Sequence, residues 1–237
     1  MSLNKKILVF TATYNEAENI VELINSIMKQ NFNLHLLIID DNSPDGTSEK
    51  ILFMQKELKN LFLIKRSKKL GLDTAHKEGY NFALNNDYDY FITMDADLSH
   101  DPNELINFVN NLSNYQVVIG SRFIKGGKCL MKGKRSILSK YGNLFIKYFF
   151  NFNCNEFTTS YRGFNLKKLD NFSLKDVSSR GYSFFMETVY QIHSRGFSIK
   201  QIPIHFADRK KGKSKIPKIE IIRTLFNVLK LKFKSRF

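Results

Sequence analysis

Residues 1–120 alternate short apolar runs with amphipathic segments, and this alternation restricts the fold more than any other feature of the sequence. Strand-like runs begin at Ile7, Leu34, Leu61, Tyr90 and Gln116. Each of the first four is followed by a segment with a helical pattern. Runs this apolar are typical of strands that are covered on both faces. We therefore predict an α/β fold, with a mostly parallel sheet flanked by helices.

Two of the intervening segments carry a stripe of apolar residues at helical spacing. The first stripe is formed by Ile20, Leu23, Ile24, Ile27 and Met28. The second follows Pro102, which is typical of a helix's first turn, and is formed by Leu105, Ile106, Phe108, Val109 and Leu112. Because ligands of such sheets bind at the carboxyl ends of the strands, residues directly after a strand are the first candidates for a functional site.

The charge balance indicates an anionic partner. The chain has 37 Lys and Arg against 22 Asp and Glu, a formal net charge of +15. Nucleic acid, a phospholipid surface and a phosphorylated substrate all fit this excess. A composition that is 43% hydrophobic excludes a disordered chain. Cys129 and Cys154 lack metal-ligand spacing and are too few for a disulfide framework, which favours a reducing compartment.

No apolar run approaches the length of about 20 residues that a membrane-spanning helix needs. The run that begins at Ile7 is also shorter than the apolar core of about 7 to 15 residues in a secretory signal. We therefore interpret it as the first strand and expect any contact with a membrane to be peripheral.

The last third of the chain changes in character. Between Lys125 and Lys134, the stretch KGGKCLMKGK is typical of an irregular basic loop, and an aromatic-rich helix is expected after it. The final segment has an apolar stripe formed by Ile219, Ile222, Leu225, Phe226 and Leu229. It predicts a basic amphipathic helix, which either lies on an anionic membrane surface or packs on the domain. We expect a main domain of residues 1–210 and an appended segment of residues 211–237.

Three carboxylates occur at and after the end of the strand-like run YFITMD: Asp95, which is its last residue, Asp97 and Asp101. Residues i and i+2 of an extended chain point to the same side, so the first two are expected to lie close together. Close carboxylates repel unless a cation lies between them, and oxygen-only ligands suit Mg²⁺ or Mn²⁺ completed by substrate phosphates. The alternative is a solvated acidic turn in which Asp101 caps the helix after Pro102.

Two further motifs end strands. In DDNSPDGT, Asp40 and Asp41 lead into a turn and could accept hydrogen bonds from a base or ribose. A calcium loop is excluded, because Leu52 stands where that loop needs a bidentate Glu. In TYNEAENI, Tyr14 and Glu16 follow the first strand without the glycines of a dinucleotide fingerprint. No P-loop motif occurs either, so redox and P-loop functions are not expected.

Seven motifs occur in the order and approximate spacing of the inverting family 2 glycosyltransferases. They are TYNEAENI, DDNSPDGT, KKLGLDTAHKEG, MDADLSHDP, GSRF, GYSFFMETVYQ and FADRKKGKSK. Within this family the chain most resembles the dolichol-phosphate or polyprenyl-phosphate mannosyltransferases, over residues 7–216. The resemblance implies a GT-A type, Rossmann-like domain over residues 1–210. Residues 211–237 would follow this domain as the basic amphipathic segment, either on a membrane surface or packed on the domain.

The resemblance also implies an activity. A hexose, with mannose from GDP-mannose favoured, would be transferred with inversion to dolichyl or undecaprenyl phosphate, with Mg²⁺ or Mn²⁺ as cofactor. The expected partners are the nucleotide diphosphate sugar, the polyprenyl phosphate lipid, a membrane surface and, as in some relatives, a small membrane protein. No nucleic-acid partner is expected. The expected location is cytoplasmic, peripheral on the cytoplasmic face of a membrane.

Site residues are implied by position in the family's motifs. The nucleotide would be bound by Tyr14, Glu16, Ile39 and Asp41. The donor diphosphate and the metal would be bound by Asp95, Ala96 and Asp97, and Ser99 stands where some relatives have a metal-contacting Gln. The positions that contact donor phosphates or sugar are Arg122, Arg209 and Lys215, and the positions where the acceptor phosphate docks are Arg135 and Ser139.

The expected catalytic residues are Asp97, Arg122, Arg209 and Lys215. A metal on Asp97 and the three cations would stabilise the negative charge that develops on the leaving diphosphate. A phosphate acceptor is already ionised at neutral pH and needs no general base. Two departures from the family's pattern are Ala12, where proline is usual, and EFTTSYR, with Glu156 for the usual Asp and Thr159 for Gly.

Other functions remain open from sequence alone. The donor could be UDP-glucose or a UDP-aminosugar. A saccharide hydroxyl acceptor would require a general base, for which Glu187 is the candidate. The non-enzymatic alternatives are a basic nucleic-acid-binding module, suggested by the charge and by 14% aromatic residues, and a catalytically silent adaptor.

Overall fold

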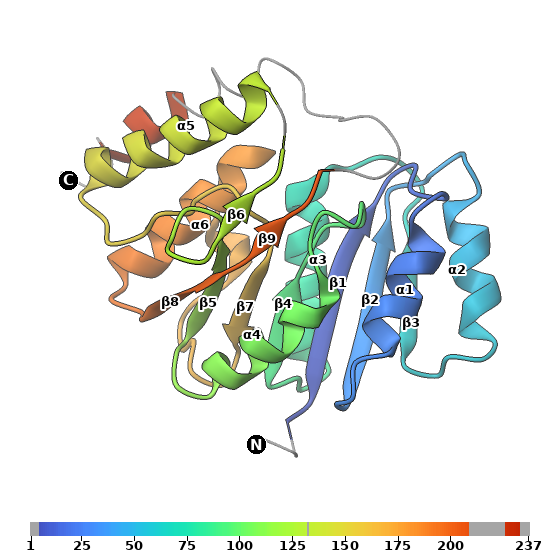
Figure 1. The fold of residues 1–237 in the computed structure, drawn as a ribbon. Helices are drawn as coiled ribbons and strands as arrows, with labels where there is room; N and C mark the ends of the chain where they lie inside the picture. The colour runs from blue at the N-terminus through green and yellow to red at the C-terminus, as the bar shows by residue number, and fades with distance from the viewer. Residues whose placement is uncertain (1–4, 132, 209–225, 233–237) are drawn as a thin grey trace.

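The computed structural model describes residues 5–131, 133–208 and 226–232. Its central sheet has seven strands in the order β3-β2-β1-β4-β7-β5-β8 (Figure 1). The strands are β1 (Ile7–Thr13), β2 (Leu34–Asp40), β3 (Leu61–Lys65), β4 (Tyr90–Thr93), β5 (Val117–Ser121), β7 (Arg162–Asn165) and β8 (Ile199–Pro203). β7 runs antiparallel to β4 and β5, whereas the other neighbouring pairs are parallel. The predicted α/β fold is confirmed.

Helices cover both faces of this sheet (Figure 1). They are α1 (Ile20–Met28), α2 (Thr47–Gln55), α3 (Leu72–Asn85), α4 (Leu105–Leu112), α5 (Lys134–Phe150) and α6 (Tyr182–Ser194), with short 3₁₀ turns η1 (Pro102–Glu104) and η2 (Leu174–Asp176). Alternate residues of β1 enter opposite cores, as the pleat requires. Leu8 and Phe10 pack with α3 and α6, whereas Ile7 and Val9 pack with α1 and α4.

A second, two-stranded parallel sheet joins β6 (Lys128–Cys129) to β9 (His205–Phe206). The prediction of an irregular loop from Lys125 to Lys134 is therefore wrong at β6. The close approach to the end of β5 depends on Gly127, where a Cβ would lie 2.4 Å from the carbonyl oxygen of Ser121. Such a contact is impossible for any residue with a side chain.

The strand β7 was not predicted, because its sequence RGFN lacks an apolar pattern. Arg162 is fully buried, and its guanidinium donates hydrogen bonds to the carbonyl oxygens of Thr159, Phe157 and Phe185. Gly163 leaves room for α4, since a Cβ there would lie 2.9 Å from Leu112. Tertiary contacts therefore place this strand, and no periodicity in the sequence indicates it.

Residues 226–232 are helical and pack beside α5. Val228 and Leu231 are buried in the core cluster that contains Phe150, and the Lys232 ammonium donates to the carbonyl oxygen of Phe149 at 3.1 Å. This part of the C-terminal segment therefore packs on the domain, while Phe226 is 67% exposed. Most of the predicted amphipathic helix, including Ile219, Ile222 and Leu225, lies outside the described residues, as does the expected boundary at residue 210. None of the described helices is long and apolar enough to cross a membrane.

Candidate functional site

The strand order reverses between β1 and β4. The chain runs from β1 outwards through β2 to β3, and then returns to place β4 on the other side of β1. Ligands of open α/β sheets bind at such a reversal of strand order. Tyr14 follows β1 here, Asp40 and Asp41 lie at the end of β2, and the DAD motif follows β4. The three strand-end motifs therefore share one edge.

The DAD motif lies in a turn and not in extended chain. β4 ends at Thr93, and Leu98 in this turn has a φ of 61°. The expectation that Asp95 and Asp97 project to one side of a strand therefore does not apply. Asp97 is buried, and its Oδ1 accepts hydrogen bonds from the Ser99 amide (3.1 Å) and the Ser99 hydroxyl (2.5 Å). The Asp95 side chain is 35% exposed and accepts from the hydroxyl of Ser160.

A buried histidine holds this turn in place. His100 Nδ1 accepts the backbone N–H of Asp95 at 3.0 Å, and its ring packs against Tyr161 and Phe206. Because Nδ1 is an acceptor, the proton of the neutral ring lies on Nε2, which is 3.3 Å from the Thr159 hydroxyl. Burial lowers the pKa of His100 despite the nearby Asp95 and Asp97, so the ring stays neutral.

Arg122 and Glu156 form a buried ion pair beside the turn. The guanidinium donates to both carboxylate oxygens, with Nε at 2.8 Å and Nη2 at 2.7 Å, and Nη2 also donates to the Thr158 hydroxyl. The central carbon of the guanidinium, Cζ, lies over the rings of Phe123 and Phe206. Burial alone would raise the pKa of Glu156, but the Arg122 charge lowers it below its ordinary value. Sequence reasoning assigned Arg122 to the donor and did not foresee this partner.

The inner face of α5 is tied to the same region. Asn143 donates to the Ser139 carbonyl oxygen at 2.8 Å and to the Thr158 hydroxyl at 3.2 Å, and it accepts from the amide of Phe157 at 2.6 Å. Ser139, one of the two predicted acceptor positions, is half-buried one turn before it. The side chain of Arg135, and all of Arg209 and Lys215, lie outside the described residues.

The end of β2 carries two carboxylates with different partners. Asp40 is fully buried and accepts hydrogen bonds from Thr13, Ser43 and Ser48, which fastens the loop after β2. Asp41 accepts from Arg66 Nη1 at 2.7 Å and from the amide of Gly71 at 2.8 Å. Sequence reasoning missed Arg66, although it directly follows β3 at the same edge of the sheet.

The other residues predicted to bind the donor differ in whether their side chains are available for contact with it. The Lys69 ammonium lies 3.7 Å from the centre of the Tyr14 ring, which brings the loop after β3 to the end of β1. Glu16 is buried, and its carboxylate accepts from the side-chain Nδ2 of Asn19 at 2.8 Å. Ile39 is fully buried within β2, so its side chain belongs to the core. Ala96 is also buried, and can contribute only its backbone and methyl group.

The turn offers oxygen donors from Asp95, Asp97 and Ser99, while the His100 Nδ1 is already engaged. Within the described ranges, no group of three His, Cys, Asp or Glu side chains gathers as a complete protein cage for a metal. Mg²⁺ and Mn²⁺ accept oxygen ligands, and Mg²⁺ commonly takes part of its shell from substrate phosphates and water. The donor set therefore fits such a cation.

Glu187 on α6 holds a loop together. Its carboxylate accepts from the amide of Ser179 at 2.7 Å and from the amide of Ser178 at 3.0 Å. Burial would raise the pKa of Glu187, but these hydrogen bonds outweigh burial and lower it. A carboxylate of lowered pKa is a weaker base, so this geometry does not favour Glu187 as a general base.

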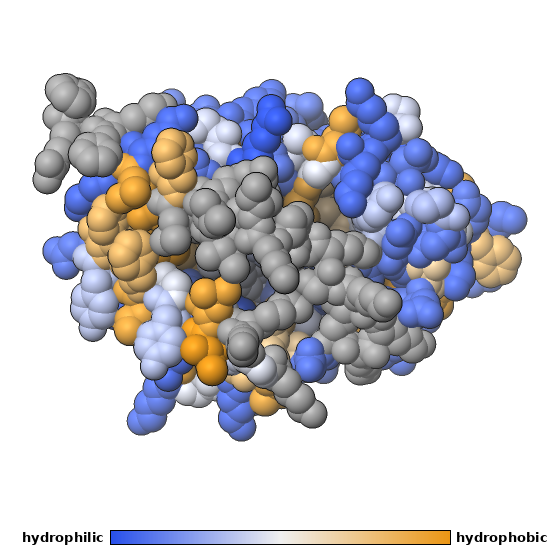
Figure 2. All heavy atoms as spheres, turned by 90° about the horizontal axis from the view of Figure 1, so that it is seen from above, coloured by the Kyte–Doolittle hydropathy of each residue, from blue (hydrophilic) through white to orange (hydrophobic). Residues whose placement is uncertain are grey.

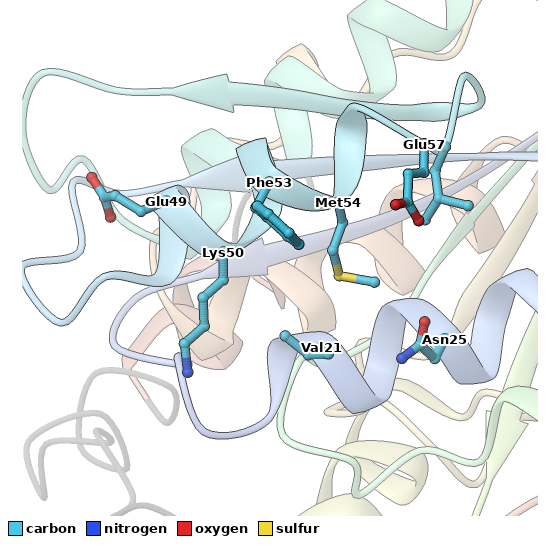
Figure 3. A pocket seen from close by; sticks show the side chains of 8 residues that line it. Val21, Asn25, Glu49, Lys50, Phe53, Met54 and Glu57 are labelled. Carbon is cyan, nitrogen blue, oxygen red and sulfur yellow. The ribbon is translucent and has the colours of Figure 1, made fainter.

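A groove of about 630 Å³ lies elsewhere, between α1 and α2. Figure 3 shows Val21 and Asn25 on one helix facing Phe53 and Met54 on the other. None of the predicted site residues lines this groove. It is therefore separate from the strand-end motifs.

Two known proteins match most of this chain in sequence. The polyprenol monophosphomannose synthase of Mycolicibacterium smegmatis is 29% identical over 237 residues, which cover 98% of this chain and 89% of the relative. The undecaprenyl-phosphate mannosyltransferase of Micrococcus luteus is 30% identical over 212 residues, which cover 89% of this chain and 87% of the relative.

Solved structures show the same fold. A glucosyl-3-phosphoglycerate synthase from Mycobacterium tuberculosis in complex with UDP gives a TM-score of 0.68 at 15% identity, over 97% of this chain and 80% of that one. The mannosyltransferase PcManGT from Pyrobaculum calidifontis, in complex with GDP-Man and Mn²⁺, gives a TM-score of 0.58 at 22% identity over 88% of this chain. This chain covers 58% of that longer protein. The fold is therefore GT-A-like.

The sequence of residues 8–172 matches the profile of the family described as glycosyl transferase family 2. This match spans most of the sheet and both acidic strand-end motifs. The chain belongs to glycosyl transferase family 2 and is a glycosyltransferase.

Proposed function

We propose that this glycosyltransferase transfers mannose from GDP-mannose, with inversion, to the phosphate of a polyprenyl phosphate such as dolichyl or undecaprenyl phosphate. The observation that carries the proposal is the similarity, over most of the chain, to two enzymes whose names specify mannose and a polyprenyl or undecaprenyl phosphate. The net charge of +15 suits a reaction in which donor, acceptor and membrane surface are all anionic. The enzyme would work peripherally on the cytoplasmic face of a membrane, with residues 1–210 as its catalytic domain.

The donor would lie across the carboxyl ends of β1, β2 and β4. Tyr14, Glu16, Asp41 and the backbone at Ile39 would bind the nucleotide, and the DAD turn would bind the diphosphate. Mg²⁺ or Mn²⁺ held by Asp95, Asp97 and Ser99 would supply positive charge next to the leaving diphosphate. Arg209 and Lys215 would add positive charge for the donor phosphates.

Arg122 would act while it remains ion-paired with Glu156. The pair fixes the segment that carries Thr159 and Ser160, and those residues contact His100 and Asp95. Arg122 would therefore have two roles. It would position the residues around the DAD turn, and its positive charge would stabilise the donor phosphates. Arg135 and Ser139 at the start of α5 would bind the acceptor phosphate, which needs no base because it is already ionised.

A hydroxyl acceptor would instead require a base, and Glu187 tests this alternative. Glu187→Gln is expected to change kcat by less than about threefold, whereas loss of a general base costs about 10²-fold to 10⁴-fold. The stability of the variant should fall by about 1 to 3 kcal/mol, because the amides of Ser178 and Ser179 lose a charged acceptor. Steady-state kinetics and denaturant unfolding measure the two effects. A large loss of kcat with unchanged unfolding would favour the hydroxyl acceptor.

The function is tested by incubating the protein with polyprenyl phosphate and a panel of radiolabelled nucleotide sugars that includes GDP-mannose, UDP-glucose and a UDP-aminosugar. Label is expected to enter the lipid phase from GDP-mannose in the presence of Mg²⁺ or Mn²⁺, and chelation with EDTA should abolish transfer. Transfer from a UDP-sugar alone would contradict the proposed donor. Label that reaches a saccharide but never the lipid would contradict the proposed acceptor.

A further inference from the structure

The outer face of α5 is apolar where a helix on a protein surface is normally charged. Six large side chains on it are exposed: Ile137 (58%), Leu138 (47%), Tyr141 (62%), Leu144 (42%), Phe145 (44%) and Tyr148 (72%). Their spacing places them on one side of the helix, and we call them the α5 stripe. Among residues 136–150, Lys140 is the one other exposed residue.

The opposite face of α5 is firmly attached to the domain. Asn143, Ile146 and Phe150 are buried, and Asn143 is hydrogen-bonded to the segment that begins at Glu156. The helix therefore has apolar side chains on both faces, one packed in the core and one exposed. Figure 2 shows hydrophobic side chains gathered on the left of the view from above, the side on which α5 lies in Figure 1. Large exposed apolar side chains gathered in this way mark an interaction site.

The helical residues 226–232 beside α5 carry further exposed apolar and basic side chains. Phe226 and Leu229, on the helical residues 226–232 that pack beside α5, are 67% and 46% exposed. Lys140 and Lys230 are exposed on the same two helices. Two of the six stripe residues are tyrosines, whose rings are apolar and whose hydroxyls favour water. That combination is typical of the boundary between lipid and water.

We propose that the α5 stripe is the surface with which this protein binds a bilayer that contains anionic lipids. The helix would lie in the plane of the interface, with its apolar side chains among the acyl chains and the lysines beside the phosphate headgroups. The biological reason for this binding rests on the proposed function, in which the acceptor is a lipid. Ser139 lies on the inner side of the same helix, so membrane binding would hold the acceptor position level with the headgroup of a lipid substrate.

Binding is tested with vesicles of phosphatidylcholine and phosphatidylglycerol that contain no polyprenyl phosphate. The test variant combines Tyr141→Ser, Phe145→Ser and Tyr148→Ser. Its matched control combines Leu52→Ser and Phe53→Ser, two exposed apolar residues (50% and 68%) on α2. The α5 variant is expected to sediment with these vesicles at least about tenfold more weakly than the unmodified chain, whereas the control should bind as the unmodified chain does. Circular dichroism checks that both variants are folded.

Three results would overturn the inference. The α5 variant could bind the vesicles as tightly as the unmodified chain. Vesicles of phosphatidylcholine alone could bind as well as anionic vesicles, which would remove the role of charge. Light scattering could show that the unmodified chain is a dimer that the α5 substitutions separate, in which case a second copy covers the stripe.

Activity separates this inference from the proposed function. With a short-chain polyprenyl phosphate that is soluble in water, the α5 variant is expected to keep kcat/KM within about threefold of the unmodified chain, while transfer to vesicle-bound acceptor falls with binding. Equal loss with both acceptors would show that α5 acts in the site and not through the membrane. If no transfer occurred with any acceptor, the proposed function would fail, and vesicle binding would still test the stripe.

Discussion

Asp97→Asn is expected to lower kcat by about 10³-fold, the largest effect that the structure predicts for a single side chain. The loss corresponds to about 4 kcal/mol of barrier, a magnitude within reach of a metal's contribution to charge stabilisation. Asparagine keeps the shape of the side chain and can still accept from Ser99, so the fold should be preserved. Steady-state transfer at saturating Mn²⁺ measures the activity, and electron paramagnetic resonance measures binding of Mn²⁺ in the presence of GDP.

Asp101→Asn provides the matched control for this variant. Asp101 is exposed four residues further on, and its side chain caps η1 by accepting the amide of Asn103 at 2.9 Å. Asparagine is an equally good cap, so kcat and Mn²⁺ binding should remain within about threefold of the unmodified enzyme. Equal activity losses in both variants would indicate a general effect of acidic charge. Unchanged Mn²⁺ binding by Asp97→Asn would remove Asp97 from the metal site.

The second large effect is expected on stability. Glu156→Leu removes a fully buried carboxylate and leaves the Arg122 guanidinium, whose side chain is 5% exposed, without its ionic partner. Breaking a buried pair in this way costs about 3 to 5 kcal/mol, because the remaining charge is desolvated without compensation. The free energy of unfolding, measured by denaturant titration, should fall by that amount. Glu156→Gln, which keeps the shape, should show a smaller loss in the same direction.

The double variant Arg122→Met with Glu156→Leu is the control for the ion pair. It removes both charges together, so it should recover part of the stability that Glu156→Leu loses, while the amides of Thr158 and Thr159 lack their acceptor in both variants. If both variants were equally destabilised, shape and not the unpaired charge would explain the effect.

Acid stability gives an independent check on the ion pair. The pKa of Glu156 in the folded protein lies below its ordinary value of 4.5. Its contribution is therefore present above pH 4.5 and is lost as pH falls through the folded pKa. Glu156→Leu should flatten this part of the stability profile.

The sequence predicted the parts of the fold that depend on local pattern. The strands β1 to β5 and the helices α1 and α4 all match apolar runs or stripes that are visible in one segment of chain. The strands β7 and β8 could not be predicted in this way. β7 has a buried arginine and a glycine, and its place between β4 and β5 depends on partners that are distant in sequence.

The same division holds for the candidate site. The carboxylates after β2 and β4 were foreseen, because the ends of parallel strands meet at one edge of the sheet. The residues that hold them were not foreseen, since each contact joins separate segments. Arg66 reaches Asp41 across 25 residues, His100 meets Thr159 across 59, and Arg122 pairs with Glu156 across 34. A periodicity argument contains no information about such pairs.

The proposed mechanism depends on a divalent cation that the DAD turn would hold against the donor diphosphate. The most direct test is a crystal structure of the enzyme grown with GDP-mannose and Mn²⁺, with diffraction data collected at the manganese absorption edge. We expect an anomalous peak in contact with a carboxylate oxygen of Asp97 and with the diphosphate of the nucleotide. A nucleotide bound elsewhere, with no manganese peak beside Asp95 or Asp97, would contradict it.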